Sequence, residues 1–117
     1  VIMDSGWTSF LLSYWHRDTS EFTLEEAVHY LTAKQARVIG LNDRGSLEVG
    51  KYADINVIDI DRLSERQPMR VHDFPGGAPR FIQRAVGYRA TVVNGQVILE
   101  NDELTGVVGG SVLRNSG

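Results

Sequence analysis

The hydrophobic period of this chain changes once along its length, and this change limits the fold more than any other feature. Before Gly40 the apolar residues recur at a helical spacing of about 3.6 residues, and after Gly50 they alternate with polar ones at a spacing of about two. The sequence therefore predicts an α+β fold, in which two or three N-terminal helices precede a small, mainly antiparallel β-sheet. We expect the helical segment at residues 1–45 and the β-rich segment at residues 46–117.

Two helices are predicted in the first part of the chain. The first covers residues 9–15, and its apolar residues at helical spacing are Phe10, Leu11 and Tyr14. The second begins at Thr23, whose hydroxyl accepts a free N–H of the first turn while Glu26 accepts the N–H of Thr23, an arrangement called a capping box. The predicted buried stripe of this second helix consists of Leu24, Ala27, Val28 and Leu31.

A third helix is predicted from the same capping pattern, which recurs at Thr32 and Gln35. Gly40 would end this helix by supplying the left-handed residue after its last turn. The apolar residues of this segment are Ala36, Val38 and Ile39.

The strongest β-signal is the pair Asn94-Gly95 between two β-branched runs at 88–93 and 96–100. Because both central residues of a type I′ turn need positive φ, this pair predicts a hairpin. Residues 53–60 alternate and suit a strand that is covered on both faces for part of its length. The other predicted features are core contacts from Val92, Val97 and Leu99, an edge strand at 69–72 within a loop at 68–79, and a partly ordered tail at 104–113.

Composition limits the class of protein and its partners. The 117 residues suffice for one domain and include no cysteine, which excludes a thiol nucleophile and agrees with a reducing, cytoplasmic compartment. The formal charge of −3, with no adjacent basic residues, does not favour nucleic-acid binding. No apolar run approaches the roughly 18 residues of a membrane span. The start at Val1 leads us to expect a segment processed or cut from a longer protein.

Histidines and acidic residues do not form a recognisable site. His16, His29 and His72 lack metal-ligand spacing, so packing or solvated roles are favoured. His72-Asp73 resembles a base with its orienting carboxylate, but neighbours in an extended segment point to opposite faces. A solubilising role is favoured over a hard-cation site for Asp54, Asp59 and Asp61.

Other candidate groups also have a simpler structural interpretation. Ser9 and Ser13 lie in no Gly-x-Ser-x-Gly elbow, and the glycines at 76–77 and 106–110 have no phosphate-binding context. A core or subunit contact is favoured over a sugar or base platform for Trp7, Tyr14 and Trp15. We therefore predict no catalytic, cofactor-binding or metal-binding residue in this chain.

One long pattern nevertheless resembles the C-terminal signature of the metal-dependent amidohydrolases. It consists of Thr23 to Val28, Leu31-Thr32, Ala36-Arg37, Ile39 to Leu41, Asp43 to Gly45, Leu47, Gly50-Lys51, Ala53 to Ile55, Val57 and Asp59. The remainder is similar to the N-acyl-D-amino-acid deacylase, or D-aminoacylase, branch through Leu11-Leu12, Trp15, Val71 to Asp73, Pro75 to Gly77, Arg80, Gln83 to Ala85 and Gly87 to Gly95. The resemblance implies the last helices of a TIM barrel, followed by part of an accessory β-sandwich.

The resemblance also implies what this chain lacks. In that family a zinc-bound hydroxide attacks the amide, with metal ligands on barrel strands and a proton-shuttling aspartate just after the last of them. The chain resembles the part that begins after that aspartate. Asp4 matches a later aspartate, to which we assign no catalytic role.

Two functional hypotheses follow from this resemblance. The chain is either the inactive C-terminal part of a zinc-dependent hydrolase of N-acyl-D-amino acids, or a non-catalytic module that oligomerises. In both cases we expect a homo-oligomer, because without a barrel the apolar helix face would be exposed.

Overall fold

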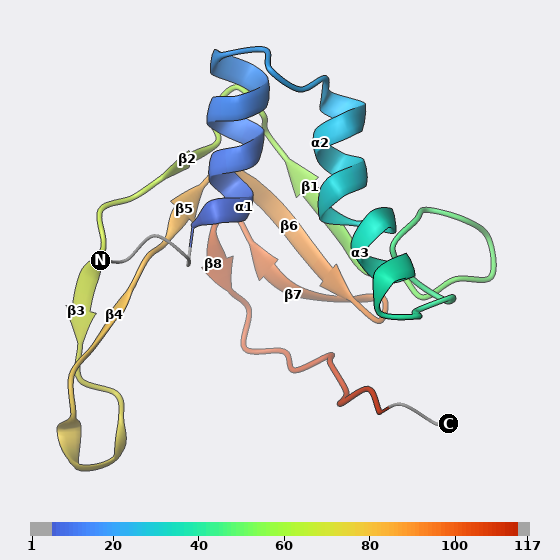
Figure 1. Cartoon of the computed structure of the whole chain (residues 1–117). Coiled ribbons are helices and arrows are strands. Elements are labelled where there is room, and N and C mark those ends of the chain that lie inside the picture. The colour runs from blue at the N-terminus through green and yellow to red at the C-terminus, as the bar shows by residue number, and fades with distance from the viewer. Residues whose placement is uncertain (1–5, 115–117) are drawn as a thin grey trace.

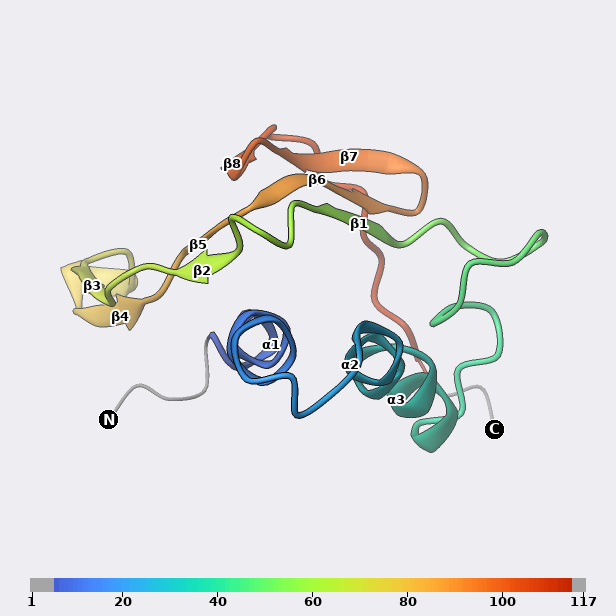
Figure 2. The same ribbon diagram turned by 90° about the horizontal axis from the view of Figure 1, so that it is seen from above.

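The computed structural model describes residues 6–114 and has its helices on one side of a sheet (Figures 1 and 2). Helix α1 (Trp7–Phe10) continues directly into the π-helix η1 (Leu11–Asp18), and α2 (Leu24–Leu31) is followed by α3 (Ala33–Val38). Antiparallel strands form a four-stranded sheet in the order β1-β6-β7-β8. These strands are β1 (Ile55–Ile58), β6 (Tyr88–Val93), β7 (Gln96–Glu100) and β8 (Glu103–Leu104). The predicted α+β class is confirmed.

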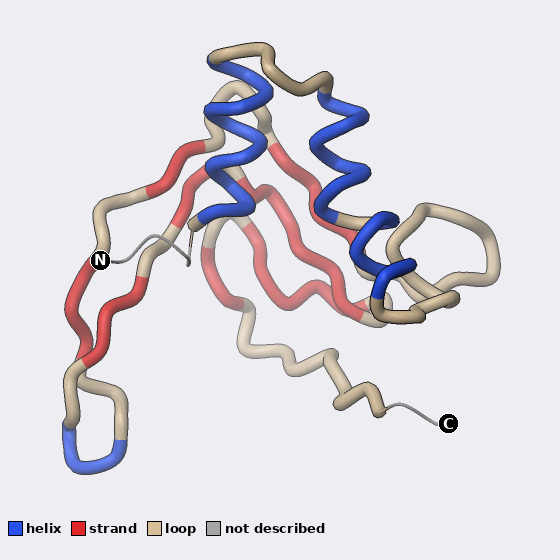
Figure 3. Tube along the Cα trace, in the orientation of Figure 1, coloured by secondary structure: helices blue, strands red, loops and turns tan. Residues whose placement is uncertain are grey.

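Two short antiparallel ladders extend from the sheet as an arm (Figure 3). The first joins β2 (Ser64–Glu65) to β5 (Ala85–Val86), and the second joins β3 (Met69–Val71) to β4 (Arg80–Ile82). A 3₁₀ turn, η2 (Pro75–Gly77), lies at the tip. The predicted edge strand is therefore present, but it ends before His72, and the predicted loop at 68–79 is a β-arm.

Three helix-terminus signals were identified in the sequence, at Thr23, Thr32 and Gly40, and the structure confirms those at Thr23 and Gly40. Glu26 N–H donates to Thr23 Oγ1 (3.1 Å) and Thr23 N–H donates to Glu26 Oε1 (3.2 Å), which confirms the capping box. Gly40 has φ +80°, as predicted for the residue after a helix end. The second capping box is wrong, because Thr32 also ends α2 and its hydroxyl donates to the carbonyl oxygen of Val28 (2.6 Å).

The predicted hairpin is confirmed with its predicted bounds. Asn94 and Gly95 have φ of +50° and +78°, as a type I′ turn requires. Val92 and Leu99 are half-buried, but Val97 is exposed, so its predicted core role is wrong. The strand predicted at 53–60 is shortened to β1, in which Ile55 and Ile58 are half-buried and Val57 is exposed.

The core lies between η1, α2 and the segment before β2. Its buried hydrophobic residues are Leu12, Ala27 and Leu63, surrounded by the half-buried Leu11, Phe22, Leu31, Ile58, Ile60 and Tyr88. On the first helix Ser9 and Ser13 are buried with Leu12, whereas Phe10 and Tyr14 are exposed, as expected for an apolar helix face without a barrel. The small serines allow the helix to approach the sheet closely, and Ser9 Oγ lies 2.7 Å from the Tyr88 hydroxyl.

Side-chain exposure corrects the buried stripe that was predicted for α2. Ala27 is fully buried and Leu31 half-buried, but Leu24 and Val28 remain exposed. In α3 only Ala36 is buried. Within residues 6–114, no helix is both long and apolar enough to cross a membrane.

Candidate functional site

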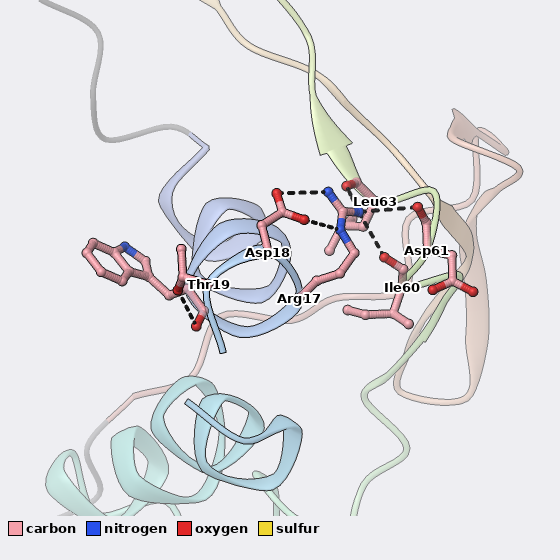
Figure 4. Close-up of polar contacts among 7 residues, drawn as sticks. Arg17, Asp18, Thr19, Ile60, Asp61 and Leu63 are labelled. Carbon is pink, nitrogen blue, oxygen red and sulfur yellow. Dashed lines mark hydrogen bonds and ion pairs between the residues drawn. The ribbon is translucent and has the colours of Figure 1, made fainter. Parts of the chain in front are cut away.

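An arginine anchor joins the first helix to the loop between β1 and β2 (Figure 4). Arg17, near the end of η1, donates through Nη1 to the carbonyl oxygens of Ile60 (3.0 Å), Asp61 (3.3 Å) and Leu63 (2.6 Å). Its Nε and Nη2 donate to the carboxylate of Asp18, which raises the pKa of Arg17. The guanidinium nitrogens Nε, Nη1 and Nη2 thus all donate to backbone carbonyl oxygens or to Asp18. Because these are contacts within the fold, we assign the anchor a structural role.

An exposed aromatic face lies on the same helix and consists of Phe10, Tyr14 and Trp15. The rings of Phe10 and Tyr14 stack at 4.9 Å, and Trp15 meets Tyr14 edge-on at 5.2 Å. The exposed fractions of Phe10, Tyr14 and Trp15 are 41%, 42% and 40%. Since the buried Ser9, Leu12 and Ser13 face the protein interior, this aromatic face is available for a further contact.

A cavity of about 400 Å³ lies between the helices, the loop at 45–47 and β1. Its apolar lining includes Leu12, Val28, Leu31, Ile55 and Ile58. Polar groups come from residues such as Thr8, Ser46, Asp54 and Asn56. The cavity suits apolar side chains better than a charged substrate, because no histidine or basic residue lines it.

Histidines do not gather into a site in the described part of the chain. His16 is half-buried and its Nδ1 bonds to the carbonyl oxygen of Phe22 (2.9 Å), whereas His29 and His72 are exposed. Asp73 does not orient His72: it accepts from Nε and Nη2 of Arg80, both at 2.6 Å. These hydrogen bonds lower the pKa of Asp73.

Acidic residues near β1 are committed to separate partners. Asp54 pairs with Arg44 (2.9 Å) and accepts the N–H of Asn94 (2.9 Å), while Asp59 pairs with Arg89 (3.2 Å). Between residues 6 and 114 there is no group of three or more His, Cys, Asp or Glu side chains able to hold a metal ion. These residues therefore do not fit a zinc site, and Asp4 lies outside the described residues.

Sequence patterns did not identify the Arg17 anchor. Its acceptors are carbonyl groups more than forty positions away, which leave no trace in side-chain spacing. The only available signal was a basic residue in the last turn of a helix, which the helix dipole already favours.

Comparison with known proteins gives a consistent set of relatives. A family model described as "Amidohydrolase family" matches residues 3–99. N-acyl-D-glutamate deacylase of Alcaligenes xylosoxydans xylosoxydans is 47% identical over 62 residues, which are 51% of this chain and 13% of that protein. D-aminoacylase of the same organism is 31% identical over 109 residues, which are 92% of this chain and 21% of that protein.

Solved structures agree with the sequence relatives. A crystal structure of D-aminoacylase, described as defining a novel subset of amidohydrolases, superposes with a TM-score of 0.73 at 29% identity. The match covers 92% of this chain and 21% of the other. The chain thus spans about a fifth, or less, of the length of these relatives.

Proposed function

Since this chain belongs to the amidohydrolase family and is similar to its D-aminoacylase branch, we propose that it is the C-terminal part of a hydrolase that acts on N-acyl-D-amino acids. The observation that supports this most strongly is the match to D-aminoacylase over 92% of the chain in both sequence and fold. The N-acyl-D-glutamate deacylase relative supports the same class of substrate.

The proposed role of the chain in that hydrolase is structural. About four fifths of the D-aminoacylase length lies outside the matched segment. The aromatic face of Phe10, Tyr14 and Trp15 provides a surface for packing against that remainder. In this arrangement the Arg17 anchor holds the helix, and with it the aromatic face, in a constant position relative to the sheet.

Zinc chemistry in the whole enzyme would depend on residues outside this chain. The described residues offer no suitable ligand cluster. One solved relative is described by its binuclear metal centre, which supports a metal in the whole enzyme without identifying it as zinc. The absence of cysteine supports a cytoplasmic location.

A second candidate is a non-catalytic module that oligomerises through the aromatic face. The observation that favours it is the exposure of three adjacent aromatic rings, which a soluble monomer rarely tolerates.

Hydrolysis of an N-acyl-D-amino acid that unmodified Alcaligenes D-aminoacylase turns over, with the L-enantiomer as control, separates these candidates. We expect no turnover by the purified chain with added zinc. A chimera in which this chain replaces the matching C-terminal fifth of Alcaligenes D-aminoacylase is expected to hydrolyse only the D-substrate. Zinc-dependent turnover by the isolated chain, or a folded chimera without activity, would contradict the proposal.

A further inference from the structure

We propose that a groove at the base of the arm binds an amphipathic carboxylate, meaning a small carboxylate that carries an apolar chain. This arm-base groove has a volume of about 410 Å³ and is lined from the arm by Ile82 and Arg84 and from the sheet by Leu99 and Leu104, among others. The carboxylate would bind to arginine, and the chain would lie along the apolar lining. The inference concerns binding alone and does not depend on the proposed hydrolase activity.

Two arginines at the base of the arm lie opposite each other. Arg66 N–H donates to the carbonyl oxygen of Arg84 (2.7 Å), which continues the register of β2 with β5 by one residue. Opposed residues of an antiparallel pair carry their side chains on the same face, where like charges are destabilising. An anion bound between the two guanidinium groups would replace this repulsion by attraction.

Neither of these arginines is neutralised within the described chain. Both side chains are exposed, and from residue 6 to residue 114 no ion pair or side-chain hydrogen bond involves Arg66 or Arg84. Ion pairs with an aspartate are formed instead by Arg17, Arg44, Arg80 and Arg89. The two guanidinium groups therefore keep their donors available for a ligand.

The local charge has the sign that such a ligand requires. Residues 62–89 contain six of the twelve basic residues of the chain and only two acidic ones, although the chain as a whole has a formal charge of −3. The arm and its base thus form a basic region on an acidic chain. An anionic ligand is favoured there over a cationic one.

Apolar side chains define what accompanies the carboxylate. Ile82 and Ala85 line the arm-base groove from the arm, and Leu99 and Leu104 line it from β7 and β8. Leu104 is 74% exposed, so contact with an aliphatic chain would remove apolar surface from water. The volume lies within the range of about 300 to 1,000 Å³ that is usual for small-molecule sites. This lining favours an aliphatic carboxylate over a phosphate polymer.

The acidic residue that lines the arm-base groove does not cancel its positive charge. Asp102 Oδ1 accepts the N–H of Tyr88 (2.7 Å), and Asp102 Oδ2 accepts the N–H of Gly87 (3.1 Å). Both carboxylate oxygens are thus bound to backbone donors. The two opposed arginines outweigh this single negative charge.

The cavity between the helices and β1 serves as an internal comparison. Its volume is nearly the same, about 400 Å³, and its lining is also largely apolar, but no basic residue contributes to it. A neutral apolar molecule has no electrostatic reason to prefer either place. A carboxylate, in contrast, is expected only in the arm-base groove.

Octanoate is the probe, titrated into the 117-residue chain and followed by methyl NMR. We expect saturable shifts of the Leu99 and Leu104 methyl groups, with constant shifts for Leu12 and Val28 in the other cavity. Octan-1-ol has the same chain without the charge and should bind about tenfold more weakly or less. Acetate has the charge without the chain and should give no saturable shift at these methyl groups.

Arginine variants test the carboxylate end of the site. We expect Arg84→Gln to lower the affinity for octanoate by about tenfold or more, because the hydrogen bonds to an ionised group are lost. Arg84→Lys should have an intermediate affinity, since an ammonium lacks the fork that matches both carboxylate oxygens. The matched control is Arg70→Gln, at another exposed arginine of the arm, which should bind octanoate as the unsubstituted chain does.

A further variant tests the apolar end. Leu104→Gln should weaken octanoate by about threefold or more, because it removes apolar contact with the chain. If Arg84→Gln does not fold, Leu104→Gln and the comparison of octanoate with octan-1-ol still decide the question.

Several outcomes would overturn the inference. Equal affinities for octanoate and octan-1-ol, or equal affinities of Arg84→Gln and Arg70→Gln for octanoate, would show that arginine does not bind the carboxylate. Shifts of Leu99 and Leu104 on dilution without any ligand would show that a second copy occupies the arm-base groove. No readout involves substrate turnover, so an inactive chimera would count against the proposed function and leave this site unaffected.

Discussion

The guanidinium of Arg17 donates a 2.6 Å hydrogen bond to the carbonyl oxygen of Leu63, a residue 46 positions further along the chain whose side chain is fully buried. This bond joins the end of the first helix to the segment between β1 and β2. Because Leu63 is part of the core, the position of the helix and the packing of the core depend on each other.

Replacing Arg17 tests this coupling. We expect Arg17→Lys to lower the thermal unfolding midpoint by about 4 °C, because an ammonium lacks the planar fork that serves several carbonyl groups and Asp18 together. The matched control is Arg62→Lys, at an exposed arginine in the same loop. Equal midpoints for the two variants in calorimetry would contradict a role for the anchor.

Gly87 lies directly against Leu63 and should tolerate no side chain. It has φ +109°, and an added Cβ would lie 2.7 Å from Leu63 Cα. We expect Gly87→Ala to reduce the free energy of unfolding by about 2 kcal/mol or more. Gly76→Ala, at φ +71° with open space around it, should cost about 1 kcal/mol from backbone strain alone. Similar values in urea denaturation would show that the contact with Leu63 is unimportant.

Gly95 tests the hairpin turn through backbone conformation alone. Its φ is +78° and an added Cβ would have nothing within 4 Å, so a substitution meets strain but no clash. We expect Gly95→Val to cost on the order of 1 kcal/mol or more in the free energy of unfolding, because β-branched residues resist positive φ. Gly95→Asn should cost much less, since asparagine tolerates this region. An unchanged unfolding midpoint for the valine variant would count against the turn.

The ion pair of Asp73 with Arg80 gives the arm a pH dependence. Hydrogen bonds from Arg80 hold the pKa of Asp73 below its ordinary value. The pair therefore stabilises the arm fully above the ordinary pKa of an aspartate, and this contribution is lost as the pH falls through the lowered pKa. NMR titration of the Asp73 carboxyl carbon should show the low value, and Arg80→Gln should return it toward normal. Because the pair is exposed, we expect added salt to weaken the effect.

Self-association is expected through the aromatic face when the chain is alone in solution. Each large side chain left exposed forgoes roughly 1.5 to 3 kcal/mol of burial, so pairing of two copies covers Phe10, Tyr14 and Trp15 favourably. Light scattering at micromolar concentration should give a dimer or higher oligomer. The double variant Phe10→Gln with Trp15→Gln should shift the mass toward a monomer, and Val108→Gln, in the exposed tail, should not. A monomeric mass for the unsubstituted 117-residue chain would refute this expectation.

Local sequence signals correctly predicted the caps and turns that are stabilised by groups only a few residues apart. The capping box at Thr23 and Glu26, the left-handed Gly40 and the Asn94-Gly95 turn all depend on neighbouring backbone groups. The two-residue strands β2 and β5 carry no periodic pattern of their own. They exist because each pairs with a partner distant in the sequence, so they could not be predicted.

The amino-acid sequence by itself determined the family, the succession of a helical part and a β-rich part, and the tight turns, because motif residues and backbone preferences act locally. Only the tertiary structure decided which side of the first helix is buried. Phe10 and Tyr14 are far more hydrophobic than Ser9 and Ser13, yet the serines face the sheet because their size permits close packing and a hydrogen bond to Tyr88. Hydrophobicity thus indicates that burial of a side chain is favourable. The shape of the surface against which the helix packs determines which side chains are buried within this chain and which remain exposed for contact with another polypeptide.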